Sequence, residues 1–159
     1  MVISPVLCIY LLLLSAISQE GGIEQVKDDV SFLASDDLNG REMGTEGELV
    51  AAQYIAERMG VLGLNPMGPE DFYQRFSVTS KSNPHATEVD TARNVIEGRN
   101  VIGFKDNGAE HTVVIGAHFD HLGMGGEGSL HAEGKAIHNG ADDNASGVGL
   151  MLQLADRLS

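Results

Sequence analysis

Apolar side chains recur at helical spacing in three parts of the chain. Apolar positions three and four residues apart predict a short amphipathic helix over about residues 23–34. A second helix is expected to begin after Thr45 and to stop at Gly60, because Glu48 follows the threonine at capping-box spacing. A third is expected over residues 146–158, again with one apolar face. The pattern therefore predicts helices that pack on a shared core.

Alternating and continuous apolar runs predict three strands. The alternation over residues 72–79 is typical of a half-buried strand. Two similar stretches follow, and we favour the later one, around Val101, as the core of a strand that runs to Lys105. Asp106-Asn107-Gly108 then predicts a hairpin turn. The run Thr-Val-Val-Ile-Gly-Ala at 112–117 predicts a buried strand.

The charge of the chain excludes some classes of partner. Lysine and arginine total 10 and acidic residues 23, so the formal net charge is −13, and every charged residue follows residue 18. So acidic a surface repels phosphate backbones and anionic membranes. Aromatic residues make up 5% of the chain and tryptophan is absent, which argues against a stacking platform for bases. We expect neither nucleic acid nor a membrane surface as a partner.

The first residues have the pattern of a secretory signal. An uninterrupted apolar run over residues 6–14 is followed by Ala16-Ile17-Ser18 and then by polar Gln19. Cleavage is expected after Ser18. An uncleaved anchor is the alternative, but the run is shorter than the roughly 20 residues that span a bilayer. Cleavage would remove Cys8, the single cysteine, so we expect a thiol-free protein that is secreted or periplasmic, without stable membrane association.

Candidate chemistry gathers in the segments 116–123 and 140–147. His118 comes directly after the predicted buried strand, a position where open α/β sheets bind ligands. Asp120 lies two residues on, so on an extended backbone it points the same way, and one of the two could bind a metal while the other orients it. Asp142 and Asp143 enter the turn before the last helix. Two ligands do not close a zinc site, so spacing alone leaves metal binding open.

The other candidates have plainer explanations. His131 and His138 lie in the glycine-rich loop and are expected to be solvated. His121 could line the site without binding metal, and this alternative stays open. Arg41 and Arg75 are single basic residues in acidic surroundings, and we expect both to form structural ion pairs.

Both segments resemble motifs of the M28 metallopeptidases, the di-zinc aminopeptidases. Gly-Ala-His-Phe-Asp-His-Leu-Gly at 116–123 is similar to the first metal motif of that family, and Gly-Ala-Asp-Asp-Asn-Ala-Ser-Gly at 140–147 to the second. Leu-Asn-Gly-Arg at 38–41 and Tyr-Gln-Arg-Phe at 73–76 resemble its N-terminal region. The resemblance implies an α/β fold: a three-layer α/β/α arrangement with a mixed sheet, here incomplete on the C-terminal side.

The resemblance also implies roles for individual residues. His118 would be a terminal ligand of one zinc ion, and Asp143 would bridge two zinc ions through its two carboxylate oxygens. Asp142 is the competing choice for the bridge. Asp120 would be the catalytic residue that polarises His118. In the family the peptide bond after the bridging aspartate is often cis, which here is the bond from Asp143 to Asn144.

The resemblance implies residues that the sequence does not contain. An adjacent pair of glutamates, one the general base and one a ligand, is absent, and only His118 and Asp143 of the expected zinc ligands are present. We therefore expect residues 1–18 to be a signal peptide and residues 19–159 to be the N-terminal part of an M28 catalytic domain. The complete enzyme would hydrolyse peptides or proteins with a zinc-activated water, whereas this chain alone would be inactive. A non-catalytic binding domain of the same fold and a glutaminyl-cyclase-like acyltransferase are the alternatives, and the oligomeric state is left open.

Overall fold

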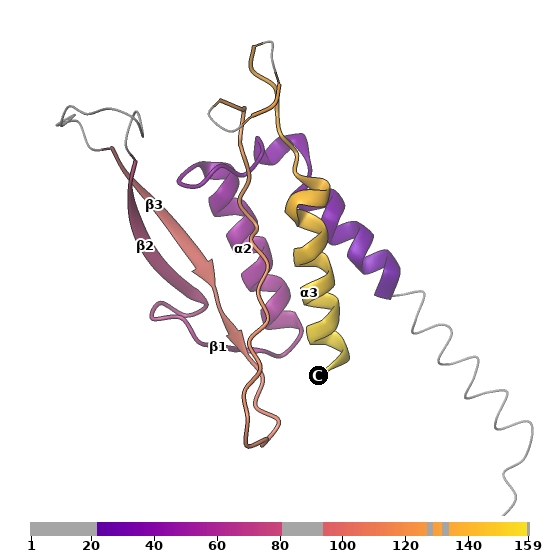
Figure 1. The fold of residues 1–159 in the computed structure, drawn as a ribbon. Coiled ribbons are helices and arrows are strands. Elements are labelled where there is room, and N and C mark those ends of the chain that lie inside the picture. Colours follow the sequence, from indigo (N-terminus) through magenta and orange to yellow (C-terminus); the bar gives the residue numbers. More distant parts are fainter. Residues whose placement is uncertain (1–21, 81–93, 127–128, 132–133, 159) are drawn as a thin grey trace, which may run out of the picture.

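A computed structural model describes residues 22–80, 94–126, 129–131 and 134–158 (Figure 1). The expected signal peptide, residues 1–18, lies outside the described residues. No helix in the described ranges is both long enough and apolar enough to cross a membrane.

Three helices form where the apolar spacing predicts them. The first covers residues 22–33, followed by a short 3-10 helix, η1 (Asp36–Leu38). The second, α2 (Glu46–Val61), begins at Thr45, whose hydroxyl oxygen accepts a hydrogen bond from the Glu48 N–H at 3.4 Å. The third is α3 (Ser146–Arg157), which follows the irregular turn η2 (Ala141–Ala145). The predicted helices are therefore confirmed.

The strand prediction is confirmed for one segment and wrong in its detail for the next. β2 (Tyr73–Ser80) pairs antiparallel with β3 (Asn94–Val101) along its whole length. The favoured strand from Val101 to Lys105 is reduced to β4 (Gly103–Phe104), which pairs with β1 (Asn65–Pro66). β3 takes in the earlier stretch and the first part of the later one because both lie opposite β2, and beyond Val101 the contact continues only as the hydrogen bond from the Ile102 N–H to the Phe72 oxygen at 2.7 Å.

The predicted buried strand at residues 112–117 does not form. The segment pairs with no other strand of the described residues, and Val113 and Val114 are 80% and 89% exposed. The turn before it exists, since the Gly108 N–H donates to Asp106 Oδ1 at 2.8 Å, but no hairpin ladder follows. The physical reason is pairing: in the described part of the chain no strand lies in hydrogen-bonding register with this segment.

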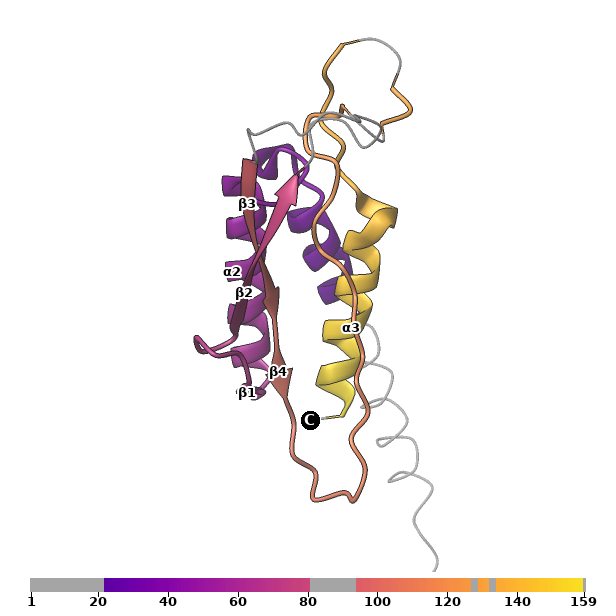
Figure 2. The same cartoon turned by 60° about the vertical axis from the view of Figure 1, so that its left-hand side comes forward.

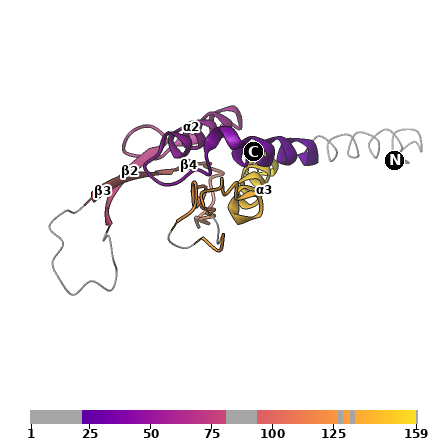
Figure 3. The same ribbon diagram turned by 90° about the horizontal axis from the view of Figure 1, so that it is seen from above.

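The elements show α/β character. The β2–β3 hairpin runs beside α2, and the extended chain that leads from β4 to the last turn runs beside α3 (Figure 2). Seen from above, the helices lie together and the hairpin projects to one side of them (Figure 3). The strands of the described residues form two separate two-stranded antiparallel sheets, and the expected three-layer arrangement is not confirmed.

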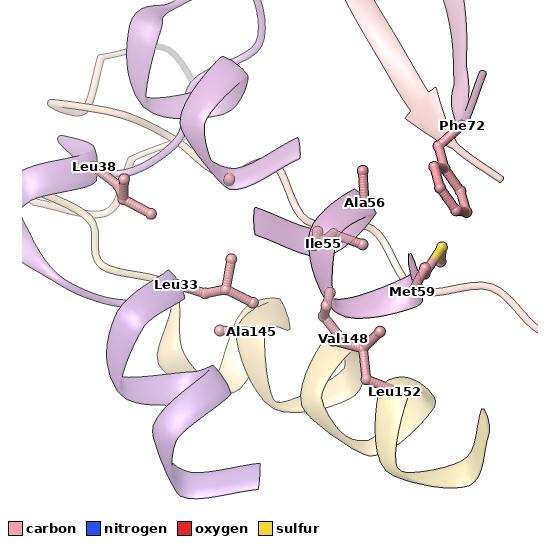
Figure 4. Close-up of a cluster of buried hydrophobic side chains, with 10 residues drawn as sticks. Leu33, Leu38, Ile55, Ala56, Met59, Phe72, Ala145, Val148 and Leu152 are labelled. Carbon is pink, nitrogen blue, oxygen red and sulfur yellow. The ribbon is translucent and has the colours of Figure 1, made fainter. Parts of the chain in front are cut away.

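The core lies between the three helices (Figure 4). Leu33 from the first helix, Ile55 from α2, and Val148 and Leu152 from α3 are each at most 2% exposed. Asp29 adds a buried polar contact between the first helix and α2, and its Oδ1 accepts from Tyr54 at 2.6 Å and from Arg58 at 2.9 Å. This packing fixes the start of α3, and with it the turn that carries the acidic candidates.

Candidate metal site at the turn before α3

His118 and Asp143 meet in space. The His118 Nε2 atom lies 2.9 Å from Asp143 Oδ1, although the two residues are far apart in the sequence. Both side chains are more than half exposed, so the pair is open to solvent. The sequence-predicted ligands are therefore brought together, with an imidazole nitrogen and a carboxylate oxygen facing one another.

Asp120 lies on the opposite edge of the His118 ring. The His118 Nδ1 atom is 3.1 Å from the Asp120 backbone carbonyl oxygen and 3.5 Å from its carboxylate Oδ1. The carbonyl is the nearer acceptor, so it makes the hydrogen bond, and the carboxylate adds negative charge behind it. A proton on Nδ1 that is donated to this oxygen leaves the Nε2 lone pair directed at Asp143.

The turn that carries Asp143 is not a regular helix. Asp143 and Asn144 have non-helical backbone angles, and the peptide bond between them is cis, as the resemblance implies. The Ser146 hydroxyl donates to the Asp142 backbone oxygen at 2.9 Å. The Asp143 carboxylate faces two histidines, with Oδ1 toward His118 and Oδ2 toward His121.

His121 lines the site beside Asp143. Its Nδ1 atom lies 3.9 Å from Asp143 Oδ2, and its side chain is 14% exposed. Burial lowers the pKa of His121, and the Asp143 carboxylate opposes that shift. The lowered pKa favours the neutral form of this imidazole at the wall of the site.

The glycine-rich loop holds its histidines differently from the prediction. His138 is half-buried rather than solvated: its Nε2 lies 2.7 Å from the Ser129 hydroxyl and its Nδ1 2.8 Å from the Ala136 carbonyl oxygen. His131 is exposed, as expected. His138 was missed because its partners are contributed by the loop's own fold, which the sequence pattern does not show.

Arg41 is the site residue that sequence reasoning placed wrongly. It is fully buried and forms no ion pair with the residues that the structure describes; instead its guanidinium donates to backbone carbonyl oxygens of Leu33, Phe119, Asn139 and Gly140. The corresponding expectation for Arg75 is confirmed, because its Nε lies 2.9 Å from Glu70 Oε2. The only signal for Arg41 was its place in the Leu-Asn-Gly-Arg stretch, since backbone acceptors leave no trace in the sequence.

Gly40 lets three loops approach one another beside the site. Its φ is +73°, and a Cβ atom there would lie 2.4 Å from the Gly123 carbonyl oxygen and 2.7 Å from that of His138. The Gly123 N–H donates to the Gly40 oxygen at 3.0 Å, and the His138 N–H donates to the Gly123 oxygen at 2.8 Å. The missing side chain at Gly40 is therefore what allows the glycine-rich loop to close onto the site.

The residues present fit part of a zinc site. An imidazole nitrogen and a carboxylate oxygen are ligands that zinc accepts, and His118 and Asp143 present one of each to the same space. Within the described ranges, no cluster of three or more histidine, cysteine or acidic residues is arranged to hold a metal ion. The described chain thus offers two candidate ligands, with Asp120 beside one of them.

Comparison with known proteins agrees with this geometry. Residues 100–159, which include both motifs, match the sequence profile of Peptidase family M28. Residues 100–159 are therefore similar to Peptidase family M28, and we call them the M28 segment. The M28 segment contains His118, Asp120 and Asp143.

One curated relative extends the likeness beyond the M28 segment. The chain is 30% identical over 120 residues to the alkaline phosphatase isozyme conversion protein of Escherichia coli (strain K12). The aligned part covers 75% of this chain and 33% of that protein, so the chain spans about a third of the relative's length. No solved structure matches the chain.

Proposed function

We propose that the protein is a zinc-dependent peptidase, an aminopeptidase that acts on peptides or proteins, to which this chain contributes His118 and Asp143 as metal ligands. The observation that carries the proposal is the 2.9 Å approach of His118 Nε2 to Asp143 Oδ1 inside the segment that matches Peptidase family M28. A pair of zinc ions is the cofactor that the family implies.

The chain's own residues prepare a place for a cation. The Asp120 carbonyl and carboxylate hold the Nδ1 side of His118, which orients the ring and fixes the tautomer that binds metal through Nε2. Asp143 offers two oxygens, one toward His118 and one toward His121. When bound, zinc supplies the acidity that activates water for attack on a carbonyl near neutral pH.

We assign no general base to the residues of this chain. The sequence contains no adjacent glutamates, and Asp120 lies against the Nδ1 side of His118, where it serves that proposed ligand. We therefore expect the 159-residue polypeptide to bind zinc without hydrolysing an aminoacyl reporter. Hydrolysis that requires zinc would show that the chain holds a base of its own.

Calorimetric zinc titration of the purified protein tests the ligand assignment. His118→Ala and Asp143→Asn should each weaken zinc binding more than tenfold, because each removes a ligand. Asp142→Asn is the matched control, since it removes one carboxylate charge from the neighbouring residue and should leave affinity within twofold. Equal losses of zinc affinity in both aspartate variants would show that only the negative charge of the turn matters, which contradicts a specific role for Asp143. A loss in Asp142→Asn alone would overturn the assignment of Asp143.

We also propose that the protein is exported. Support comes from the apolar run at residues 6–14 with small residues before Gln19, and from the position of the single cysteine inside that segment. The net charge of −13 fits a protein that binds neither nucleic acid nor anionic lipid.

A further inference from the structure

Arg41 joins the segments that carry the two proposed ligands. Its Nε donates to the carbonyl oxygen of Phe119, the residue after His118, at 2.7 Å. Its terminal nitrogens donate to the oxygens of Asn139 at 2.6 Å and Gly140 at 3.0 Å, at the entry to the turn that carries Asp143. A single guanidinium thus spans both sides of the site.

The same guanidinium also anchors the site to the helical core. One terminal nitrogen donates to the Leu33 carbonyl oxygen, at the end of the first helix, and Leu33 itself is fully buried. A guanidinium has five N–H donors in a rigid planar fork, so it can hold several acceptors at fixed directions, which the single ammonium of lysine cannot do. One side chain therefore connects both loops to the helical core.

The charge of Arg41 also bears on the site. Burial lowers the pKa of Arg41. The Asp120 and Asp143 carboxylates oppose that shift, because negative charges nearby stabilise the charged guanidinium. Arginine keeps its charge even when buried, since its ordinary pKa is far above neutrality. The buried cation therefore attracts the carboxylates of both segments.

We propose that Arg41 is a positioning residue that sets the separation between His118 Nε2 and Asp143 so that both can bind one cation. The inference rests on the proposed metal site, and it differs from a general stabilising role in one respect. A stabilising residue lowers the unfolding temperature when it is replaced, whereas a positioning residue also changes the affinity of correctly folded protein for metal.

Arg41→Gln and a matched control separate these two roles. Arg58→Gln is the control, because Arg58 is a mostly buried arginine whose partner, Asp29, lies in the helical core away from the site. Both variants should lower the unfolding temperature. Zinc titration at a temperature where both are folded should show at least a tenfold weaker affinity for Arg41→Gln, and a change within twofold for Arg58→Gln. Equal affinities in the two variants would overturn the proposal.

Two further measurements keep the outcome decisive. If Arg41→Gln does not fold, Arg41→Lys replaces it, and it should still bind zinc several times more weakly, because lysine keeps the charge but cannot serve acceptors on both loops. In metal-free protein, a nuclear Overhauser contact between the His118 ring and the Asp143 β-protons should be present in the wild type and lost in the Arg41 variant. Wild-type protein that binds no zinc would refute the proposed function. In that case the contact between His118 and Asp143 would decide the role of Arg41 by itself. Persistence of the contact in the Arg41 variant would refute the inference.

Discussion

Replacing Gly40 by alanine tests whether close backbone approach builds the site. The Cβ of alanine would lie 2.4 Å from the Gly123 carbonyl oxygen and 2.7 Å from that of His138, and both are backbone atoms that cannot rotate away. The φ of +73° adds a second cost, because residues with a side chain avoid this region. Gly40→Ala must therefore shift the loop or strain the backbone.

The size of the effect follows from these two causes. A left-handed conformation costs a residue with a Cβ roughly 1–2 kcal/mol. Inserting a methyl group into a filled space costs about 1–3 kcal/mol more. The free energy of unfolding of Gly40→Ala should therefore fall by about 2–5 kcal/mol. In a chain of this size, each kcal/mol lost lowers the unfolding temperature by ~2–4 °C.

Gly63 provides the control that separates the two causes. Its φ is +71°, nearly that of Gly40, but a Cβ there would meet no atom within 4 Å. Urea and thermal unfolding of Gly63→Ala therefore measure the backbone cost alone, and the excess loss in Gly40→Ala measures the crowding. An excess below about 0.5 kcal/mol would refute the reasoning, because the loops would then be free to separate around the new methyl group.

Other consequences can be checked by simpler measurements. Tyr54→Phe removes a donor from the buried carboxylate of Asp29 and should cost about 1.5–3 kcal/mol in urea unfolding; a loss under 0.5 would show that the carboxylate finds water instead. Leu152→Ala should cost about 2–5 kcal/mol in the same assay, whereas Leu150→Ala, on the exposed side of α3, should cost less than about 1; equal losses would contradict the assigned core. Mass spectrometry of the exported protein should find Gln19 at its N-terminus, and an intact leader would indicate an anchor.

The helices could be predicted because their signals are local. Apolar residues at three- and four-residue spacing mark the buried face of α2, and Thr45 caps it within one turn. The reciprocal half of the capping box does not form: the Thr45 N–H donates to the Glu42 oxygen at 3.0 Å, and the Glu48 carboxylate, 1% exposed, lies 3.2 Å from Arg99 on β3. The Glu48 side chain thus faces a residue on a distant strand and not the start of its own helix, and the local sequence pattern does not contain that information.

The strands were harder to predict because a strand depends on its neighbour. Residues 94–98 and 100–103 have nearly the same apolar pattern, and only the pairing with β2 decides that Asn94–Val101 is the strand. Residues 112–117 carry the stronger apolar run, but that run fixes neither a hydrogen-bonding partner nor burial. The β propensity of these residues favours an extended backbone, but a strand also needs a neighbouring strand to pair with, which propensity does not provide.

The sequence pointed to the residues that meet at the candidate site but not to what holds them there. The sequence pointed to His118, Asp120 and Asp143 because they carry chemistry in a recognisable order. Arg41 and Gly40 act through backbone carbonyl oxygens and through the absence of a side chain, which every sequence offers in abundance. No pattern of residue types distinguishes such contacts before the loops are placed in space.

The position of His118 shows which of these features the site depends on. The prediction placed this residue at the end of a buried strand, which would have aimed it by the register of a sheet. That strand does not form, yet His118 Nε2 still lies 2.9 Å from Asp143 Oδ1. The contacts that remain are those of Arg41 with the backbone on both sides of the site, and the approach of three loops at Gly40. The approach of His118 to Asp143 is therefore set by the loops packed on the helical core, and any pairing of residues 112–117 would add to a geometry that already exists without it.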